Sequence, residues 1–164
     1  MSRRGRLWLV ELEGGHRLAA YRDIAGVWTI GAGLTRYSSG VRVKEGDHFA
    51  SVGQAQRAFD DYLLRFELDV DAMTRDDLLQ HEFDALVSFC WNLGPDNLRR
   101  STLLRRVNEK APAPAIADQF AAWHFADGHS VPGLITRRLR EIEVYEGGEY
   151  RDQGGRPIDV QGGS

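Results

Sequence analysis

The sequence predicts an α+β fold: one short helix, then a small antiparallel β lobe, then a larger helical lobe, with a ligand cleft between the two lobes. Two observations carry this prediction. Residues 16–50 combine strand-favouring side chains with regular glycines, whereas apolar residues recur every three or four positions from residue 51 onward. We expect one domain over residues 1–150, with the β lobe at about 16–50 and the helical lobe at about 51–146. The polar, glycine-rich residues 151–164 are expected to form a flexible tail.

The first predicted element is a helix over residues 5–13. Trp8 and Leu12 fall on one of its faces, and two glycines at 14–15 supply the stop. The β lobe that follows contains strand-favouring residues, above all at 27–30, and glycines mark its turns. This pattern predicts a small sheet made of short hairpins.

The helical lobe is predicted from its caps and its apolar stripes. Ser51 and Gln54 are spaced as in a capping box. Ser101 or Thr102 can cap a further short helix, and Pro132 can open the last one. The apolar stripe of that last helix consists of Ile135, Leu139, Ile142 and Tyr145.

The overall composition limits the possible classes of protein. The 164 residues, 42% apolar and 27% charged, suit a globular domain, and no stretch is apolar for long enough to cross a membrane or to form a signal-peptide core. A formal net charge of −3 argues against a dedicated nucleic-acid binder. Short basic clusters such as residues 137–140 are interpreted as solvated helix faces. Cys90, the single cysteine, allows no internal disulfide and argues against a thiolate zinc site, and its apolar neighbours predict a buried structural thiol.

Two carboxyl groups and one hydroxyl group are candidates for catalysis. Glu13 and Asp23 stand at the two ends of a predicted turn, and Thr29 follows on the next strand. Glycoside hydrolysis commonly uses two carboxyl groups beside the scissile bond, one protonated and one ionised. The carboxyl end of a helix disfavours negative charge, which suits Glu13 to the protonated role, whereas Asp23 lies among polar neighbours. The spacing alone is also typical of two solvated surface acids, and His16 between them is interpreted as a solvated turn residue.

A wider pattern extends over most of the chain. Its parts are Glu13-Gly14, residues 17–23, residues 26–31, residues 83–89, Asn92-Leu93-Gly94, residues 101–104, Pro132-Gly133-Leu134 and Arg137-Arg138. In this order and spacing they resemble the phage lysozymes, glycoside hydrolase family 24, over about residues 7–146. The resemblance implies a lysozyme-like fold and a muramidase that hydrolyses the β-1,4 bond between N-acetylmuramic acid and N-acetylglucosamine in bacterial peptidoglycan.

The resemblance also implies residue roles and partners. Glu13 matches the acid, Asp23 the second carboxylate and Thr29 the residue that positions water; Asn92 is a candidate for binding an acetamido group. No metal or organic cofactor is implied. The implied partners are peptidoglycan strands and a holin, a hole-forming membrane protein through which an enzyme without an export signal passes from the host cytoplasm to the wall. We expect a monomer with no nucleic-acid partner.

Two departures from the family pattern bear on activity. Nine residues lie between Glu13 and Asp23, where the family usually has eight, and we place the extra residue within 14–16. Leu34 stands where many family members carry a histidine. Glu11 is a weaker alternative as the acid, because it would lengthen the spacing further.

Three functions remain open from the sequence. The leading hypothesis is a peptidoglycan hydrolase that acts in phage-driven lysis. A lytic transglycosylase would cut the same bond and leave an anhydro-sugar end, but Thr29 favours hydrolysis because it gives a water molecule a place to be activated. A wall-binding module without activity would fit the extra turn residue and the acidic net charge, which provides no overall attraction to anionic wall polymers.

Overall fold

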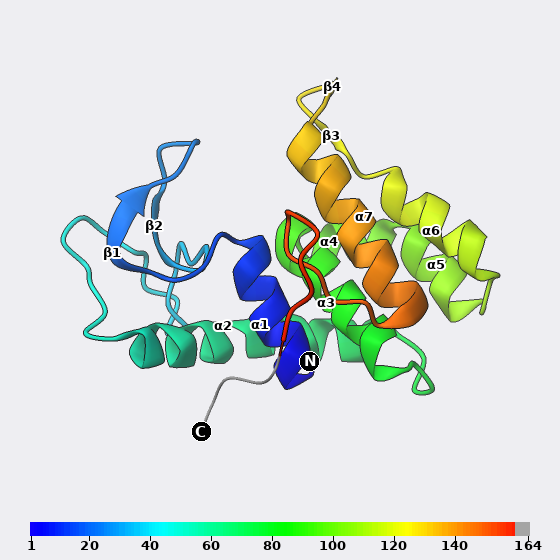
Figure 1. The fold of residues 1–164 in the computed structure, drawn as a ribbon, viewed down its shortest axis with the longest axis horizontal. Coiled ribbons are helices and arrows are strands. Elements are labelled where there is room, and N and C mark those ends of the chain that lie inside the picture. The colour runs from blue at the N-terminus through cyan, green and yellow to red at the C-terminus, as the bar shows by residue number, and fades with distance from the viewer. Residues whose placement is uncertain (160–164) are drawn as a thin grey trace. The chain divides into compact units, whose positions relative to one another are not determined.

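The structure is a computed structural model that describes residues 1–159, and Figure 1 shows its fold. The chain divides into two compact units. The sheet unit comprises Leu9–Arg65, and the helical unit comprises Met1–Trp8 together with the chain from Phe66 onward. Helices dominate and the strands form two small antiparallel pairs, so the predicted α+β class is confirmed. Within the described part of the chain, no helix is both long enough and apolar enough to span a membrane.

The sheet unit is built around one antiparallel hairpin. Tyr21 lies opposite Thr29, and the register shifts between Arg17 and Tyr21, which marks a bulge in the first strand. A tight turn follows the second strand directly, because Ile30 and Leu34 exchange backbone hydrogen bonds of 2.8 and 2.9 Å. The elements that belong wholly or partly to this unit are α1 (Arg3–Leu12), β1 (Arg17–Arg22), β2 (Trp28–Gly31) and α2 (Val52–Met73).

The helical unit packs around buried aromatic side chains. The ring of Phe89 meets those of Phe120 and Trp123 edge-on, with centroids 5.7 and 5.5 Å apart. Cys90 directly follows Phe89 in the sequence and is fully buried. Burial raises the pKa of its thiol to about 12, as expected for a structural thiol. The remaining elements are α3 (Gln80–Leu93), α4 (Pro95–Arg100), α5 (Thr102–Asn108), α6 (Ala113–Ala121), β3 (Phe125–Ala126), β4 (His129–Ser130) and α7 (Pro132–Gly147).

Hydrogen bonds confirm two of the predicted helix starts. Ser51 Oγ accepts from the Gln54 N–H at 3.2 Å immediately before α2. Ser101 Oγ accepts from the Leu104 N–H at 3.0 Å, so Ser101 rather than Thr102 caps α5. The β3–β4 hairpin was not predicted, because strands of two residues are too short to produce an alternating pattern.

Helix α7 begins at Pro132 as predicted, but its predicted apolar stripe is buried only towards the C-terminal end, where Tyr145 is 5% exposed. Ile135 and Leu139, expected in the buried stripe, are 50% and 47% exposed. The arginines at 137–138 and Glu141 are buried instead, so the interpretation of this basic cluster as a solvated face is wrong. Arg138 Nε lies 2.8 Å from Glu141 Oε2, and such ion pairs let charged side chains occupy a core position that apolar periodicity cannot reveal.

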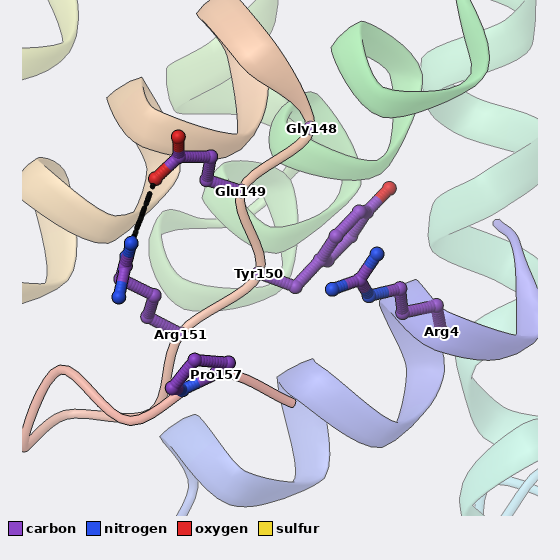
Figure 2. Close-up of a pocket in the computed structure, with 6 residues that line it drawn as sticks. All are labelled: Arg4, Gly148, Glu149, Tyr150, Arg151 and Pro157. Carbon is purple, nitrogen blue, oxygen red and sulfur yellow. Dashed lines mark hydrogen bonds and ion pairs between the residues drawn. The ribbon is translucent and has the colours of Figure 1, made fainter. Parts of the chain in front are cut away.

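The described part of the predicted tail is folded onto the helical unit (Figure 2). Tyr150 is buried, its ring packs edge-on against Trp8 at 5.7 Å, and the Arg4 guanidinium lies 5.0 Å from the centroid of the Tyr150 ring. The Ile158 N–H donates to Tyr150 O at 2.8 Å and closes a small hairpin. The chain from 151 is therefore packed as far as Ile158, and residues 160–164 of the predicted flexible tail lie outside the described residues.

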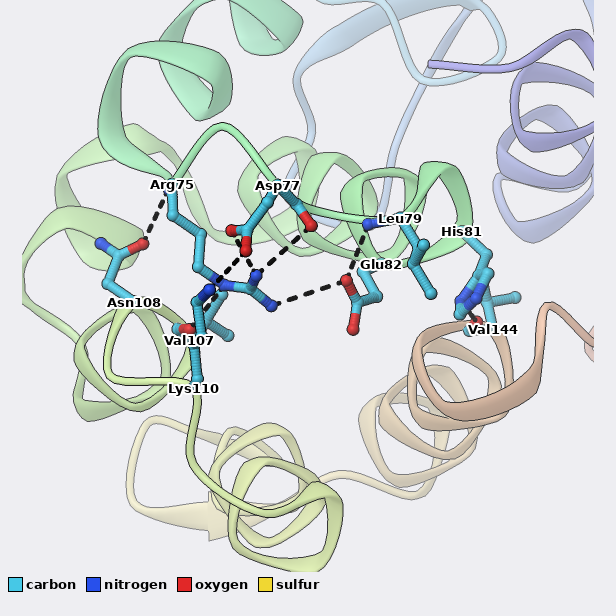
Figure 3. Close-up of polar contacts among 9 residues, drawn as sticks. All are labelled: Arg75, Asp77, Leu79, His81, Glu82, Val107, Asn108, Lys110 and Val144. Carbon is cyan, nitrogen blue, oxygen red and sulfur yellow. Dashed lines mark hydrogen bonds and ion pairs between the residues drawn. The ribbon is translucent and has the colours of Figure 1, made fainter.

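A polar cluster joins the loop after α2 to α3 and α5 (Figure 3). The Asp77 carboxylate contacts Lys110 Nζ and lies 2.5 Å from Arg75 Nη1. Hydrogen bonds from these two cations, Lys110 first, lower the pKa of Asp77 to about 2. Arg75 also lies 3.7 Å from Glu82, and its backbone N–H donates to Asn108 Oδ1 at 3.0 Å. In this cluster each cation lies beside a carboxylate.

Candidate active site

Glu13 lies directly after the last residue of α1. The Gly14 N–H donates to Glu11 O at 3.0 Å, and the Gly15 N–H donates to Val10 O at 2.9 Å. These two bonds form a Schellman motif, in which Gly14 adopts a left-handed φ of +85°. The predicted glycine stop therefore ends the helix and leaves Glu13 at its carboxyl end.

The Glu13 carboxyl group rests against the backbone of Gly33. A Cβ atom at Gly33 would lie 3.0 Å from Glu13 Oε2, which is too close for an undisturbed contact. Gly33 also has a φ of +81° and lies in the tight turn closed by Ile30 and Leu34. The turn that follows β2 thus carries the surface on which the Glu13 carboxyl group lies.

Asp23 lies in the turn of the β1–β2 hairpin. Its Oδ1 atom accepts the N–H groups of Ala25 and Val27 at 2.9 and 2.8 Å, which makes an Asx-type turn. The guanidinium of the preceding Arg22 points elsewhere and lies 4.6 Å from the centroid of the Trp28 ring. Among residues 1–159 the Asp23 carboxylate has no ion-pair partner, and its Oδ2 atom accepts no hydrogen bond. That oxygen is therefore available to a ligand.

Thr29 lies on β2, on the same face of the hairpin as Asp23. Tyr21 is directly opposite Thr29, and the Asp23 N–H bond to Val27 O at 3.0 Å continues the same register. Because side chains alternate along a strand, Tyr21, Asp23 and Thr29 share one face. Thr29 is only 3% exposed, and its hydroxyl donates to Val27 O at 3.1 Å. With its proton engaged there, Oγ1 can accept a hydrogen bond from a water molecule.

The three predicted catalytic residues are therefore connected through one strand. Asp23 pairs with the residue before β2, Thr29 lies within β2, and Glu13 contacts the turn that follows it. From Thr29 to Gly31, the last residue of β2, the strand advances by about 7 Å. The arrangement provides two carboxyl groups and a hydroxyl group along one short stretch of the sheet unit.

His16 is not the solvated turn residue that the sequence suggested. Its Nε2 atom lies 3.0 Å from Gln56 Oε1, and its ring packs edge-on against Phe59 at 5.9 Å. A Cβ atom at Gly31 would lie 3.7 Å from His16 Nδ1, and within the described chain that nitrogen is buried without a hydrogen-bond partner. The local pattern could not reveal this burial, because both partners lie on α2, far along the chain.

Asn92 lies in the helical unit, near the end of α3. Its Oδ1 atom accepts from Arg138 Nη2 at 2.8 Å, and the same nitrogen donates to Glu141 Oε1 at 3.0 Å. Asn92 does not cap α3, because Gly94 takes that position. The Asn92 amide nitrogen makes no hydrogen bond to the described residues, so its two N–H donors are available to a ligand.

One further feature of the sheet unit was not predicted from the sequence. A groove of about 510 Å³ is lined by Gly26, Val27, Trp28, Thr35, Arg36, Arg42 and Val43. Its two arginines are brought together by an antiparallel backbone bridge between Arg36 and Arg42. Local charge could have indicated it: residues 17–44 contain five basic residues and one acidic residue, in a chain of formal net charge −3.

The sequence matches a known protein family. The family model described as Phage lysozyme matches residues 11–141. The endolysin of Salmonella phage P22 is 36% identical over 133 residues, which cover 81% of this chain and 89% of that protein.

Solved structures show the same similarity. The endolysin from Escherichia coli O157:H7 phage FAHEc1 matches with a TM-score of 0.83 at 31% identity, and the match covers 92% of this chain and 96% of that one. The muramidase domain of SpmX from Asticaccaulis excentricus matches with a TM-score of 0.76, also at 31% identity, and covers 88% and 96% of the two chains. The matched family segment includes Glu13, Asp23, Thr29 and Asn92. This chain belongs to the phage lysozyme family and is a peptidoglycan-lytic glycosidase of the muramidase class.

Proposed function

We propose that this enzyme hydrolyses the β-1,4 bond between N-acetylmuramic acid and N-acetylglucosamine, with Glu13 as the acid, Asp23 as the second carboxylate and Thr29 as the residue that holds water. The observation that carries the proposal is the geometry of β2. Asp23 and Thr29 share one face of its hairpin, and the Glu13 carboxyl group rests on Gly33 in the turn that follows.

Each residue has a separate task in this reaction. Glu13 gives its proton to the glycosidic oxygen as the bond to the sugar carbon breaks. Asp23 faces the positive charge that develops on the sugar, because its Oδ2 atom is not engaged by another group of the described chain. Thr29 Oγ1 accepts a hydrogen bond from the water molecule that completes the hydrolysis.

The decisive experiment replaces Glu13 by glutamine. Glu13→Gln keeps the shape of the side chain but removes the transferable proton, so we expect lysis of purified peptidoglycan to slow by about a hundredfold or more. Glu11→Gln is the matched control: Glu11 is exposed, lies two residues earlier and is the rival candidate acid. Equal activity of Glu13→Gln and the parent, or a larger loss in Glu11→Gln, would overturn the assignment.

The products distinguish hydrolysis from the two alternatives. Hydrolysis adds one water molecule to each cleaved bond, whereas transglycosylation leaves anhydro-sugar ends. Mass spectrometry of the released fragments separates these masses, and we expect hydrated ends. A protein that sediments with peptidoglycan but releases no fragment would instead be a wall-binding module.

We further infer that Asn92 binds an acetamido group of the substrate through its amide N–H donors, with Arg138 fixing the orientation of that amide. Asn92→Asp removes the donors but keeps the acceptor for Arg138. It should therefore raise KM more than it lowers kcat. An unchanged KM would contradict a binding role.

The cellular setting is also a proposal. We infer that the enzyme acts as a monomer in host lysis and reaches the wall from the host cytoplasm through a holin. The support for a role in lysis is that the proteins it matches are named endolysins. Expression inside bacteria with and without a holin tests this. Lysis only in the presence of the holin supports it, and equal lysis without one would contradict it.

A further inference from the structure

We propose that the arginine groove (Gly26, Val27, Trp28, Thr35, Arg36, Arg42 and Val43) binds the carboxylate groups of the peptide stems that branch from the peptidoglycan glycan strand. The identity of this ligand rests on the proposed function, since peptidoglycan is the polymer that the enzyme attacks. The groove itself is a feature of the sheet unit alone.

The groove and the strands next to it in the sequence contain basic side chains without an ion-pair partner among the described residues. The basic side chains between residues 17 and 44 are Arg17, Arg22, Arg36, Arg42 and Lys44, and none of them forms an ion pair with a described residue. Arg17 and Arg22 instead lie over the rings of Tyr21 and Trp28. The groove therefore presents the positive charges of Arg36 and Arg42, which attract anions locally.

The two groove arginines form an arrangement that an anion would stabilise. Arg36 and Arg42 are opposite one another across an antiparallel bridge, which places two like charges side by side. Like charges in directly opposite positions repel. Arg36 Nη1 donates to Gly40 O at 3.1 Å, whereas Arg42 is exposed and has no polar partner in the described chain. A carboxylate bound by both guanidinium groups would remove the repulsion and accept charge-assisted hydrogen bonds from each.

The other walls of the groove favour a peptide over a bare anion. The Trp28 indole and the Val43 side chain provide apolar surface, and the Thr35 hydroxyl is a further hydrogen-bonding group. Inorganic phosphate has no apolar part to place there. A peptide stem has both an apolar part and an anionic part, because its short aliphatic side chains alternate with free carboxylates.

The position of the groove suits a branch of the substrate. Trp28 and Thr29 are neighbours on β2, so their side chains point to opposite faces of the hairpin. The groove includes Gly26 and Val27 from the turn that holds Asp23. A sugar chain at Asp23 and Thr29 would leave the Trp28 face open, and a peptide branch passing the hairpin tip would reach it.

A binding experiment with matched peptides tests this. A stem tripeptide with free carboxylates, and its twin with amidated carboxyl groups, are titrated into the full-length protein while nuclear magnetic resonance follows the Trp28 indole N–H. We expect binding of the free-acid peptide that weakens with added salt, and far weaker binding of the amidated twin. Arg42→Gln should weaken binding about threefold, and Arg36→Gln with Arg42→Gln about tenfold. Arg42→Lys should retain most of the affinity.

The matched control is Arg57→Gln. Arg57 is exposed, lies on α2 in the same unit and is outside the groove, so its replacement removes the same charge. Thermal unfolding of each variant shows whether the fold is retained.

Three results would overturn the proposal: equal binding of the two peptides, equal losses in Arg57→Gln and Arg42→Gln, or displacement of the peptide by inorganic phosphate at the same concentration. The peptide alone contains no glycosidic bond, so this test is independent of the Glu13→Gln experiment.

Discussion

In the helical unit, most arginine side chains lie beside carboxylates. In the strand region of the sheet unit, three of the four arginines lie over aromatic rings or bond to backbone carbonyls, and Arg42 has no polar partner among the described residues. Arg75 and Asp77 illustrate the first case (Figure 3). Arg22, which lies over Trp28 and donates to Gly26 O at 2.7 Å, illustrates the second. A charge that is paired within the protein is already neutralised there, whereas an unpaired charge remains available to a ligand. Arginine therefore has different roles in the two units. Substitutions in the helical unit should mainly change stability, and substitutions in the sheet unit should mainly change activity or binding.

The largest expected effect on stability lies in the helical unit, at Glu141. This carboxylate is fully buried and is bonded by Arg137, Arg138 and Ser88. Glu141→Gln leaves two buried guanidinium groups without their counter-charge, which should lower the free energy of unfolding by about 3 kcal/mol. Urea unfolding measures this change in the free energy of unfolding. The control is Glu143→Gln, which removes a partly exposed partner of Arg140 and should cost less than about 1 kcal/mol. Equal effects would show that burial of the pair is unimportant.

The sheet unit should respond in activity rather than in stability when Asp23 is changed. Asp23→Asn keeps an Oδ1 acceptor for the N–H groups of Ala25 and Val27, so the turn should persist. Loss of the carboxylate should lower the rate of peptidoglycan lysis by about a hundredfold. Asp23→Ala loses the turn bonds as well, and should add about 1 kcal/mol of destabilisation. Full activity in Asp23→Asn would remove Asp23 from the catalytic set.

A pair of glycine substitutions tests the contact between Glu13 and the turn. Gly33 and Gly46 have φ values of +81° and +84°, so alanine at either position should cost about 1 kcal/mol. Only at Gly33 would the new Cβ press on the Glu13 carboxyl group, because at Gly46 nothing lies within 4 Å. We expect similar melting temperatures but a lower kcat in Gly33→Ala alone. Equal kcat values in the two variants would contradict this placement of Glu13.

We expect the smallest effect for the exposed ion pair of Asp77, whose contribution to stability depends on pH. Its pKa is lowered from 3.8 to about 2 in the folded protein, so its contribution to stability is present above pH 3.8 and is lost as the pH falls towards 2. The difference in melting temperature between the parent and Asp77→Asn should therefore be small and constant near neutral pH and shrink in that acidic window. A difference that grows on acidification would have the wrong sign for this ion pair.

Local signals in the sequence predicted much of this structure. The glycines after α1, the capping serines at 51 and 101, and Pro132 each act within a few residues of where they stand, so their effects could be read directly. Asp23 was placed in a turn and Thr29 on the strand after it for the same reason, because glycines and strand-favouring residues are local signals.

Features that depend on distant partners were missed. The predicted stripe on α7 is correct at Tyr145 but wrong at Ile135 and Leu139. Periodicity detects apolar residues and cannot detect a buried ion pair with Glu141. His16 was expected in solvent, since nothing near it in the chain indicates Gln56. The packing of Tyr150 against Trp8 joins the two ends of the chain in the same way.

The α+β class and several helix starts follow from the amino-acid sequence alone, which also names the candidate carboxyl and hydroxyl groups. These depend on periodicity, caps and turn residues, which act over a few positions. Only the tertiary structure decided which charges are paired and which are left open, because charge pairing depends on distance in space. For this reason the sequence could not show that Arg138 is buried beside Glu141, whereas Arg42 is exposed in a groove of the sheet unit.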